Sequence, residues 1–183
     1  MLHHSYDQAV ASLSRSAREV LLGVLRPYRP EDEAQVLRWA ADELTYWRWS
    51  AGSLGSWPLA AGALNKRLAC YPVCSTLVWY WEGSPAGFVH LYPQPDAEHG
   101  IRFGYVLLDP ALRGGGLGKR MIACAVHHAR TKMKAQHMYL AVYRNNPAAV
   151  RCYEANGFRL NAALPLRQDT CMGECWECQQ MIR

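Results

Sequence analysis

The chain has 183 residues, of which 50% are apolar and 19% are charged, so it can bury the core of one globular domain and does not have a disordered composition. Twenty Lys and Arg against fifteen Asp and Glu give a net charge of +5, which suits a polyanionic small ligand. The basic residues are scattered along the chain instead of forming one stripe, which argues against a nucleic-acid-binding protein.

No apolar run approaches the length of a membrane span, and the N-terminus lacks the cationic-then-apolar order of a signal peptide. We therefore expect a soluble, cytoplasmic protein with no membrane partner.

Seven cysteines are an odd number, so they cannot all pair within one chain. Cys171, Cys175 and Cys178 invite a metal interpretation, but a structural zinc site needs a fourth ligand and none lies near in sequence. Reduced thiols that pack as small apolar side chains are favoured, with no metal.

Residues 1–24 are expected to form an N-terminal extension that can be helical, since apolar residues from Ala9 to Leu21 fall near helical spacing. Residues 25–183 are expected to form a single domain. Hydrophobic periodicity, β-branched runs and turn residues define its elements. They are a strand over 24–28, a helix over 30–44, an aromatic-rich segment over 46–52, a helix over 58–68, strands over 75–81, 86–92 and 101–108, a helix over 117–135, a strand over 137–143, a helix over 148–155 and a strand near 176–182.

Aromatic and basic residues are interleaved between the first two of these helices and into the second: Tyr46, Trp47, Arg48, Trp49, Trp57 and Lys66. Such side chains can fill the interface between helices and a sheet, or they can form the wall of a ligand site. Stacking on single-stranded nucleic acid is a third interpretation. Core packing is favoured over a ligand wall, and both are favoured over nucleic acid.

The segment from Tyr105 to Lys119 is read as a strand, a proline-containing turn and a glycine-rich bend that opens a long helix. Gly114–Gly116 let the main chain approach a ligand closely, because no Cβ stands in the way. The first turn of the helix offers unpaired N–H groups and the positive end of the helix dipole to the same bend. The bend is therefore a candidate seat for a phosphate or pyrophosphate, with positive charge from Arg113, Lys119 and Arg120 around it.

Two well-known phosphate motifs do not fit this segment. Arg120 stands where G-x-x-x-x-G-K-[ST] requires Ser or Thr, and Lys119 stands where G-x-G-x-x-G requires its third glycine. The pattern that fits is R-x-x-G-x-G, at Arg113, Gly116 and Gly118. On a strand–loop–helix, this pattern resembles the acetyl-CoA pyrophosphate loop of the GCN5-related N-acetyltransferases.

A second segment, one helix and one strand further on, strengthens the resemblance. N-x-x-A-x-x-x-Y-x-x-x-G-F occurs from Asn146 to Phe158, with its tyrosine at Tyr153. The resemblance implies an α/β fold with a mostly antiparallel central sheet and a splayed parallel strand pair that accepts acetyl-CoA. It also implies a bulge in the strand over 101–108, where Gly104 already indicates a bulge or a close approach of two main chains.

The resemblance also implies roles for individual residues. The cofactor would be bound by the end of the strand, the bend and the second motif: Val106, Leu107, Leu108, Arg113, Gly114, Gly115, Gly116, Leu117, Gly118, Lys119, Asn146 and Tyr153. Tyr153 would be the general acid that protonates the departing thiolate. Each has a structural alternative, since Tyr153 can be a packing residue and Asn146 can be a helix cap before Pro147.

The general base cannot be assigned. Many members of the family have a glutamate in the strand before the bend, but Arg102 occupies the position checked first and that strand has no carboxylate. Asp96, Glu98 and His99 in the preceding loop are weak candidates, and His99 has the most suitable intrinsic pKa. The amine could also arrive already neutral.

The sequence therefore predicts an acetyl-CoA-dependent N-acetyltransferase that moves the acetyl group directly to a primary amine of a small molecule or peptide. A covalent intermediate on Cys152 is disfavoured, because adjacent helix residues face different directions. The alternative function is a non-catalytic acyl-CoA-binding sensor or partner module. No nucleic-acid partner is expected, and the protein would be a monomer or a homodimer.

Overall fold

A computed structural model describes residues 8–9 and 12–183 of the chain. Its centre is one eight-stranded sheet, in which seven strands follow the order β1-β2-β3-β4-β5-β8-β6 and β7 pairs with β8 outside this path. The strands are β1 (Val24–Pro27), β2 (Ser75–Trp81), β3 (Ser84–Pro93), β4 (Gly100–Leu108), β5 (His137–Tyr143), β6 (Arg159–Leu160), β7 (Arg167–Cys171) and β8 (Glu174–Ile182). Only β4 and β5 are parallel. The predicted mixed fold with one parallel pair is confirmed.

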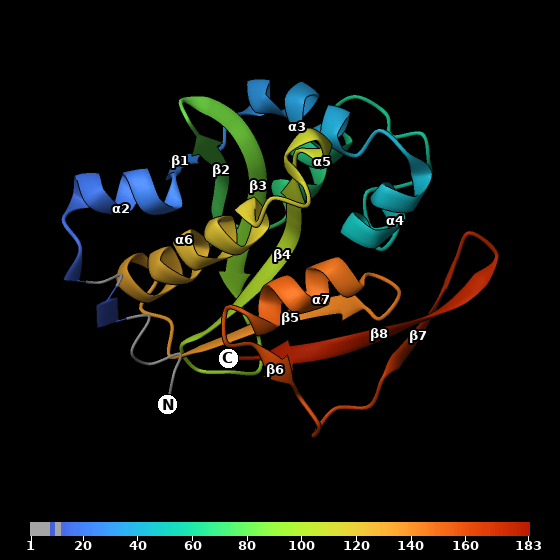
Figure 1. The fold of residues 1–183 in the computed structure, drawn as a ribbon. Coiled ribbons are helices and arrows are strands. Elements are labelled where there is room, and N and C mark those ends of the chain that lie inside the picture. The colour runs from blue at the N-terminus through green and yellow to red at the C-terminus, as the bar shows by residue number, and fades with distance from the viewer. Residues whose placement is uncertain (1–7, 10–11) are drawn as a thin grey trace.

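Helices cover both faces of the sheet (Figure 1). One face packs against α6 (Leu117–Lys132) and α7 (Pro147–Glu154), and the apolar side chains of α6 form the main core with β2 to β5 and β8. The other face packs against α3 (Glu33–Trp39), α4 (Glu43–Ser50) and α5 (Ala63–Leu68). Two separate cores thus sandwich the sheet, as expected when each face is apolar.

The structure corrects the prediction of one helix over 30–44. A 3-10 turn (Pro30–Asp32) leads into α3, which ends at Trp39, and α4 begins after its N-cap Asp42. The Asp42 carboxylate accepts hydrogen bonds from the Thr45 N–H at 2.8 Å and the Thr45 hydroxyl at 2.6 Å. This capping starts a new helix at Glu43. An N-cap residue has a non-helical backbone, so α3 cannot continue through Asp42 into α4. The predicted helix over 58–68 is also shorter, since α5 begins at Ala63.

The aromatic-rich segment is helix α4, and it contributes to the core. Tyr46 and Trp49 are buried, whereas Lys66 on α5 is exposed. Arg48 donates a hydrogen bond to the Asn145 carbonyl, which joins α4 to the loop between β5 and α7. Core packing is therefore confirmed for Tyr46 and Trp49.

Two strands near the C-terminus were absent from the prediction. β6 and β7 both pair with β8, and β7 and β8 form a long hairpin (Figure 1). At the base of this hairpin Cys171, Cys178, Tyr143 and Trp176 form a small buried cluster, while Cys175 is exposed. No group of three or more potential metal ligands gathers among the residues that the structure describes.

The predicted N-terminal extension falls partly outside the described residues, at 1–7 and 10–11. Within the rest, α2 (Arg15–Leu22) packs against α6, as Leu22 contacts Ala123. The Trp79 indole donates a hydrogen bond to the Leu22 carbonyl at 2.8 Å. No helix in the described part of the chain is long and apolar enough to cross a bilayer.

The parallel pair separates halfway along its length. β4 and β5 are paired only from Gly100–His137 to Phe103–Leu140. Beyond Phe103, β4 continues beside β3 and β5 continues beside β8, so the two strands lose their shared hydrogen bonds. We call this opening the splay. It exposes strand edges that a ligand can pair with, because unpaired main-chain groups seek hydrogen-bond partners.

A bulge in β4 coincides with the splay. Between the pairs His90–Gly104 and Phe88–Leu107, β4 has one residue more than β3, and Tyr105 has a left-handed φ of 49°. An added Cβ on Gly104 would lie 2.9 Å from the Tyr92 ring, so Gly104 is also a position of close approach. The bulge that Gly104 indicated is present, with the irregular backbone at its neighbour Tyr105, and the close approach at Gly104 is to the Tyr92 side chain.

Candidate active site

The glycine-rich bend is open in the structure. Gly114 and Gly116 have φ of +88° and +79°, and a Cβ built on Gly114, Gly115 or Gly116 would meet nothing within 4 Å. Gly116 is the N-cap of the 16-residue helix α6 and supplies no side-chain cap. No group in the described part of the chain accepts a hydrogen bond from the N–H groups of residues 114–118. The bend thus offers a set of unpaired donors at the positive end of a helix.

The side-chain charges around the bend are arranged differently from the prediction. The Arg113 guanidinium donates to the Leu108 carbonyl at 3.1 and 3.2 Å and to the Trp39 carbonyl at 3.4 Å. Arg120 donates to the Leu21 carbonyl at 2.6 Å and lies 5.1 Å from the centre of the Trp81 ring. Both cations are held by the fold, whereas the Lys119 side chain is exposed. An anion at the bend would therefore meet mainly main-chain N–H groups.

Val106–Leu108 form the part of β4 that follows the bulge and has no partner strand on the β5 side. On the other side, Leu107 and Leu108 pair with Phe88 and Gly87 of β3. The Leu108 carbonyl is already bound by Arg113, so fewer acceptors remain at the end of the strand than the sequence predicted.

Asn146 is the N-cap of α7. Its side-chain oxygen accepts a hydrogen bond from the Ala149 N–H at 3.3 Å, and it is half-buried. The structural alternative for this residue is therefore realised. The two N–H donors of its carboxamide remain for a ligand, because capping uses only the oxygen.

Tyr153 extends from α7 into the core beside the splay. Its ring lies 6.0 Å from Phe158, which lies 5.5 Å from Phe103, the last residue of β4 that pairs with β5. The side chain is 7% exposed, and no described group hydrogen-bonds its hydroxyl. The hydroxyl oxygen is not fully buried, so a ligand can reach it. Burial raises the pKa of Tyr153 above its usual range and keeps the phenol protonated at neutral pH.

Cys152 precedes Tyr153 and faces α6, where an added Cβ on Gly118 would lie 3.5 Å from its sulfur. Burial raises the pKa of the Cys152 thiol to about 11. A thiol that is protonated at neutral pH is a poor nucleophile, which argues against a covalent intermediate on this residue.

The loop with the three candidate bases precedes the first residue of β4, whereas the splay lies along the second half of that strand. Asp96, Glu98 and His99 precede Gly100, where β4 and β5 are paired. Val106 is six residues beyond Gly100, or about 20 Å along an extended strand. The structure does not bring these side chains to the splay, so the geometry does not support them as the base.

Arg102 lies one residue before the splay begins and is held by side-chain hydrogen bonds. Its guanidinium donates to Gln94 at 3.1 Å and to Gln180 at 2.9 Å, within the paired half of β4. Its position therefore does not correspond to a base at the splay.

A polar and aromatic cluster on the α3–α5 face was missed in the sequence. It consists of Arg67, Tyr71, His90, Tyr92 and Tyr105, from α5, the segment after it, β3 and β4. We call it the Arg67 cluster. The alternation of Phe88, His90 and Tyr92 on β3 places one polar ring on an otherwise aromatic face, and this was the available signal.

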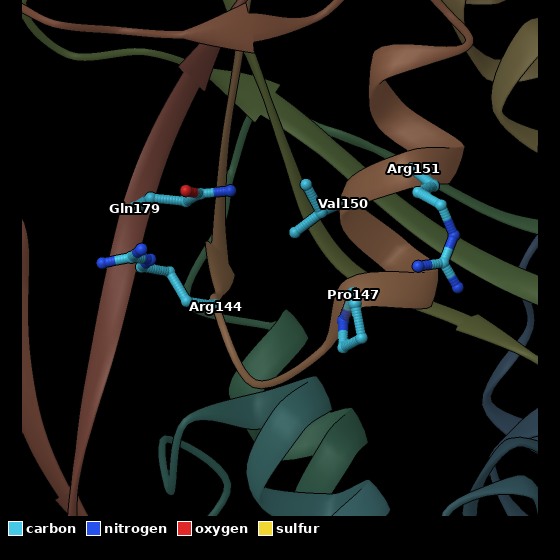
Figure 2. Close-up of a pocket in the computed structure, with 5 residues that line it drawn as sticks. All are labelled: Arg144, Pro147, Val150, Arg151 and Gln179. Carbon is cyan, nitrogen blue, oxygen red and sulfur yellow. The ribbon is translucent and has the colours of Figure 1, made fainter.

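A cavity of about 180 Å³ lies between α7, the end of β5 and β8. Figure 2 shows Gln179 and Arg144 on one side of it and Pro147, Val150 and Arg151 on the other. Val150 and Tyr153 are three residues apart and are neighbours on the surface of α7. The cavity therefore borders the helix that carries the candidate general acid.

Comparisons with known proteins agree with this geometry. Residues 34–158 match the model of the acetyltransferase (GNAT) family. The chain is 30% identical over 98 residues to the spermine/spermidine N(1)-acetyltransferase of Bacillus subtilis (strain 168), which is 51% of this chain and 64% of that protein. It is 43% identical over 67 residues to the mycothiol acetyltransferase of Streptosporangium roseum, covering 34% of this chain and 20% of that protein.

Solved structures share the fold. A spermidine N-acetyltransferase from Vibrio cholerae in complex with CoA and spermine has a TM-score of 0.72 at 18% identity, covering 87% of this chain and 94% of that chain. AAC(6')-Ib in complex with ribostamycin and coenzyme A has a TM-score of 0.67 at 17% identity, covering 87% and 92%. At these identities the likeness shows a common architecture.

Proposed function

The chain belongs to the acetyltransferase (GNAT) family, and on this premise we propose that it transfers the acetyl group of acetyl-CoA to a primary amine. The observation that carries the proposal is the open bend at Gly114–Gly116. Five consecutive N–H groups without acceptors meet the start of a 16-residue helix there, and no side chain fills the space. A diphosphate matches this arrangement in charge and in its number of acceptor oxygens.

Acetyl-CoA, as the co-substrate, would supply the acetyl group as a thioester. We propose that the N–H groups of residues 114–118 bind its pyrophosphate and that Val106, Leu107 and Leu108 pair with its pantetheine arm. The N–H groups of Arg113 and Lys119 already donate to the carbonyls of Pro110 and Gly116. The unpaired edge of β4 past Phe103 supports the second assignment. Asn146 would donate from its carboxamide nitrogen to the same arm while its oxygen caps α7.

In the proposed reaction the amine nitrogen bonds to the acetyl carbon, the carbon–sulfur bond breaks, and the sulfur leaves with the electron pair. Tyr153 gives its proton to that sulfur, since burial raises the pKa of the phenol and keeps it protonated at neutral pH. Because the main chain of β4 is unpaired at the splay, its N–H groups can stabilise negative charge on the carbonyl oxygen. The proton of the amine is lost to solvent, since no described carboxylate is assigned to receive it, and a proton from solvent restores the Tyr153 phenol.

The acceptor is proposed to be a small molecule. The relatives named above are called acetyltransferases of spermine or spermidine and of mycothiol, and one structural neighbour is bound to an aminoglycoside. The aligned segment covers 64% of the length of the polyamine acetyltransferase.

We also propose that the protein works in the cytoplasm. All seven cysteines are free, and exposed free thiols such as Cys70, Cys74 and Cys175 suit a reducing compartment.

The test is release of free coenzyme A from acetyl-CoA in the presence of a panel of amines. Amine-dependent release, with N-acetylated product seen by mass spectrometry, is the expected result. The alternative function is an acyl-CoA-binding sensor without turnover. Tight binding of CoA together with no amine-dependent release from any acceptor would favour the sensor and contradict the transferase.

A further inference from the structure

The Arg67 cluster brings a cation together with phenols at the surface of the α3–α5 face. Arg67 Nε donates to the Tyr105 hydroxyl at 3.0 Å, and Arg67 Nη2 donates to the Tyr71 hydroxyl at 3.2 Å. The guanidinium carbon lies 5.4 Å from the centre of the Tyr71 ring. Arg67, Tyr71 and Tyr105 are all half-buried, so the guanidinium and the two phenols are held in place and remain accessible.

Among the described residues, no carboxylate forms an ion pair with this cation. Within the part of the chain that the structure describes, the ion pairs involve other residues, and none includes Arg67. The acids of the covering helices have other partners. Glu33 accepts from the Gly62 N–H at 2.8 Å and the Asn65 N–H at 2.9 Å, and Asp42 caps α4. The Tyr105 hydroxyl also lies 2.9 Å from the Ser53 hydroxyl, whereas Arg67 Nη1 has no partner among the described residues. The cluster therefore has a fixed positive charge and guanidinium N–H groups that can still bind an anion.

His90 is the fully buried member of the cluster, and one of its ring nitrogens has no hydrogen-bond partner. Its Nδ1 lies 2.8 Å from the Thr76 hydroxyl on β2, while its Nε2 is buried without a partner. The ring lies 4.6 Å from Tyr71 and 5.9 Å from Tyr105. A buried polar atom without a partner is uncommon and indicates a site that is completed by something else.

The cluster stands next to the proposed site of transfer. Tyr105 is the bulge residue of β4 and directly precedes Val106–Leu108. Tyr153 approaches from the core of the opposite face, with α6 and α7. An acceptor held at the Arg67 cluster would therefore reach the splay from the side opposite to the general acid.

We propose that the acceptor of this enzyme carries an anionic group beside its primary amine, and that Arg67, Tyr71 and Tyr105 bind that group. The ligand class is an amino carboxylate or amino phosphonate. This inference rests on the proposed function. A polyamine fits the cluster poorly, because its ammonium groups would meet an unbalanced guanidinium and would find no carboxylate among the five residues of the cluster.

The experiment compares matched acceptors in the thiol-release assay: alanine, its carboxamide, aminomethylphosphonate and spermidine. Wild type is expected to use the two anionic amines with a higher kcat/KM than the carboxamide or spermidine. Arg67→Gln should lower kcat/KM for the anionic amines roughly 10- to 100-fold, the effect of losing a charge-assisted hydrogen bond, and leave the carboxamide nearly unchanged. Lys66→Gln, an exposed neighbour on α5, is the control and should change neither.

A purely structural role for Arg67 would lower activity toward all acceptors alike, so the ratio of carboxylate to carboxamide turnover separates the two cases. That ratio unchanged in Arg67→Gln, or spermidine preferred by wild type, would overturn the inference and leave the transferase intact. If no amine supports thiol release, transfer itself is refuted. Calorimetry with N-acetylalanine then still tests the site, since wild type should bind it and Arg67→Gln should not.

Discussion

Replacing Tyr153 with Phe is expected to separate catalysis from folding. The substitution keeps the ring that packs between α7 and the sheet and removes only the hydroxyl. Because no described group hydrogen-bonds that hydroxyl, its loss should change the free energy of unfolding by less than about 0.5 kcal/mol. Loss of the general acid should lower kcat by roughly 100- to 1000-fold.

Tyr143→Phe is the matched control. Tyr143 is also a buried tyrosine, but its hydroxyl donates to the Asp169 carboxylate at 2.9 Å and accepts from the Cys171 thiol at 3.5 Å. Removing it breaks a hydrogen bond to a charged group and should cost about 2 kcal/mol of unfolding free energy. Its hydroxyl lies in the cluster at the base of the β7–β8 hairpin, so kcat should stay within about twofold.

The assays are urea unfolding and thiol release at saturating acetyl-CoA and amine, between pH 6 and 9. Burial raises the pKa of Tyr153, so the acid stays protonated, and wild-type kcat should not fall through loss of this proton below pH 9. A Tyr153→Phe enzyme that keeps more than half of the wild-type kcat would refute the assignment of the acid. A large loss of stability in this variant would refute the description of its hydroxyl as unpartnered.

Three further outcomes follow from the structure. Gly116→Ala places a Cβ on a residue with φ of +79°, which should lower the free energy of unfolding by about 1–2 kcal/mol and raise the KM for acetyl-CoA about tenfold. The control is Gly62→Ala, at the N-cap of α5 with φ of +84°. It should lower the free energy of unfolding by the same amount and leave that KM unchanged. Burial lowers the pKa of His90 to about 4, from about 6.5 in the unfolded chain. Between these two pH values the unfolded state binds more protons than the folded state. The free energy of unfolding is therefore highest above pH 6.5 and decreases as the pH drops, by about 2 kcal/mol at pH 5. Urea unfolding at pH 7.5 and 5 checks this, and an equal loss in His90→Gln would count against it. Cys152→Ala should keep kcat within about twofold, whereas loss of thiol release would favour a covalent route.

The sequence was most informative where one local pattern determines one element. The β-branched and aromatic runs of β2 and β5 were predicted with their observed limits, since both strands lie within a buried sheet and read as continuous apolar segments. The glycine bend before α6 was equally clear, because a left-handed backbone at Gly114 and Gly116 is a local property.

Elements whose stability comes from their neighbours were harder to predict. β7 has the sequence Arg-Gln-Asp-Thr-Cys, with no apolar run, and it exists as a strand because β8 pairs with it. The break between α3 and α4 depends on Asp42 acting as a cap, which competes with continuation of the helix.

The candidate site divides in the same way. The residues of the two motifs lie where a local reading could place them, at the bend and on α7. The Arg67 cluster joins residues between 67 and 105 that meet only after the sheet has formed and β4 has bulged at Tyr105. Neither spacing nor composition encodes that meeting, because it depends on register and on a left-handed residue that is not glycine.

The central claim is that main-chain N–H groups at the start of α6 bind the diphosphate of coenzyme A. The direct measurement is a titration of isotope-labelled protein with coenzyme A, followed by the backbone amide signals, with pantetheine as the ligand that lacks the diphosphate. We predict that the amides of residues 114–118 shift with coenzyme A and stay in place with pantetheine. Coenzyme A that binds without moving these amides, or that moves them no more than pantetheine does, would contradict the claim.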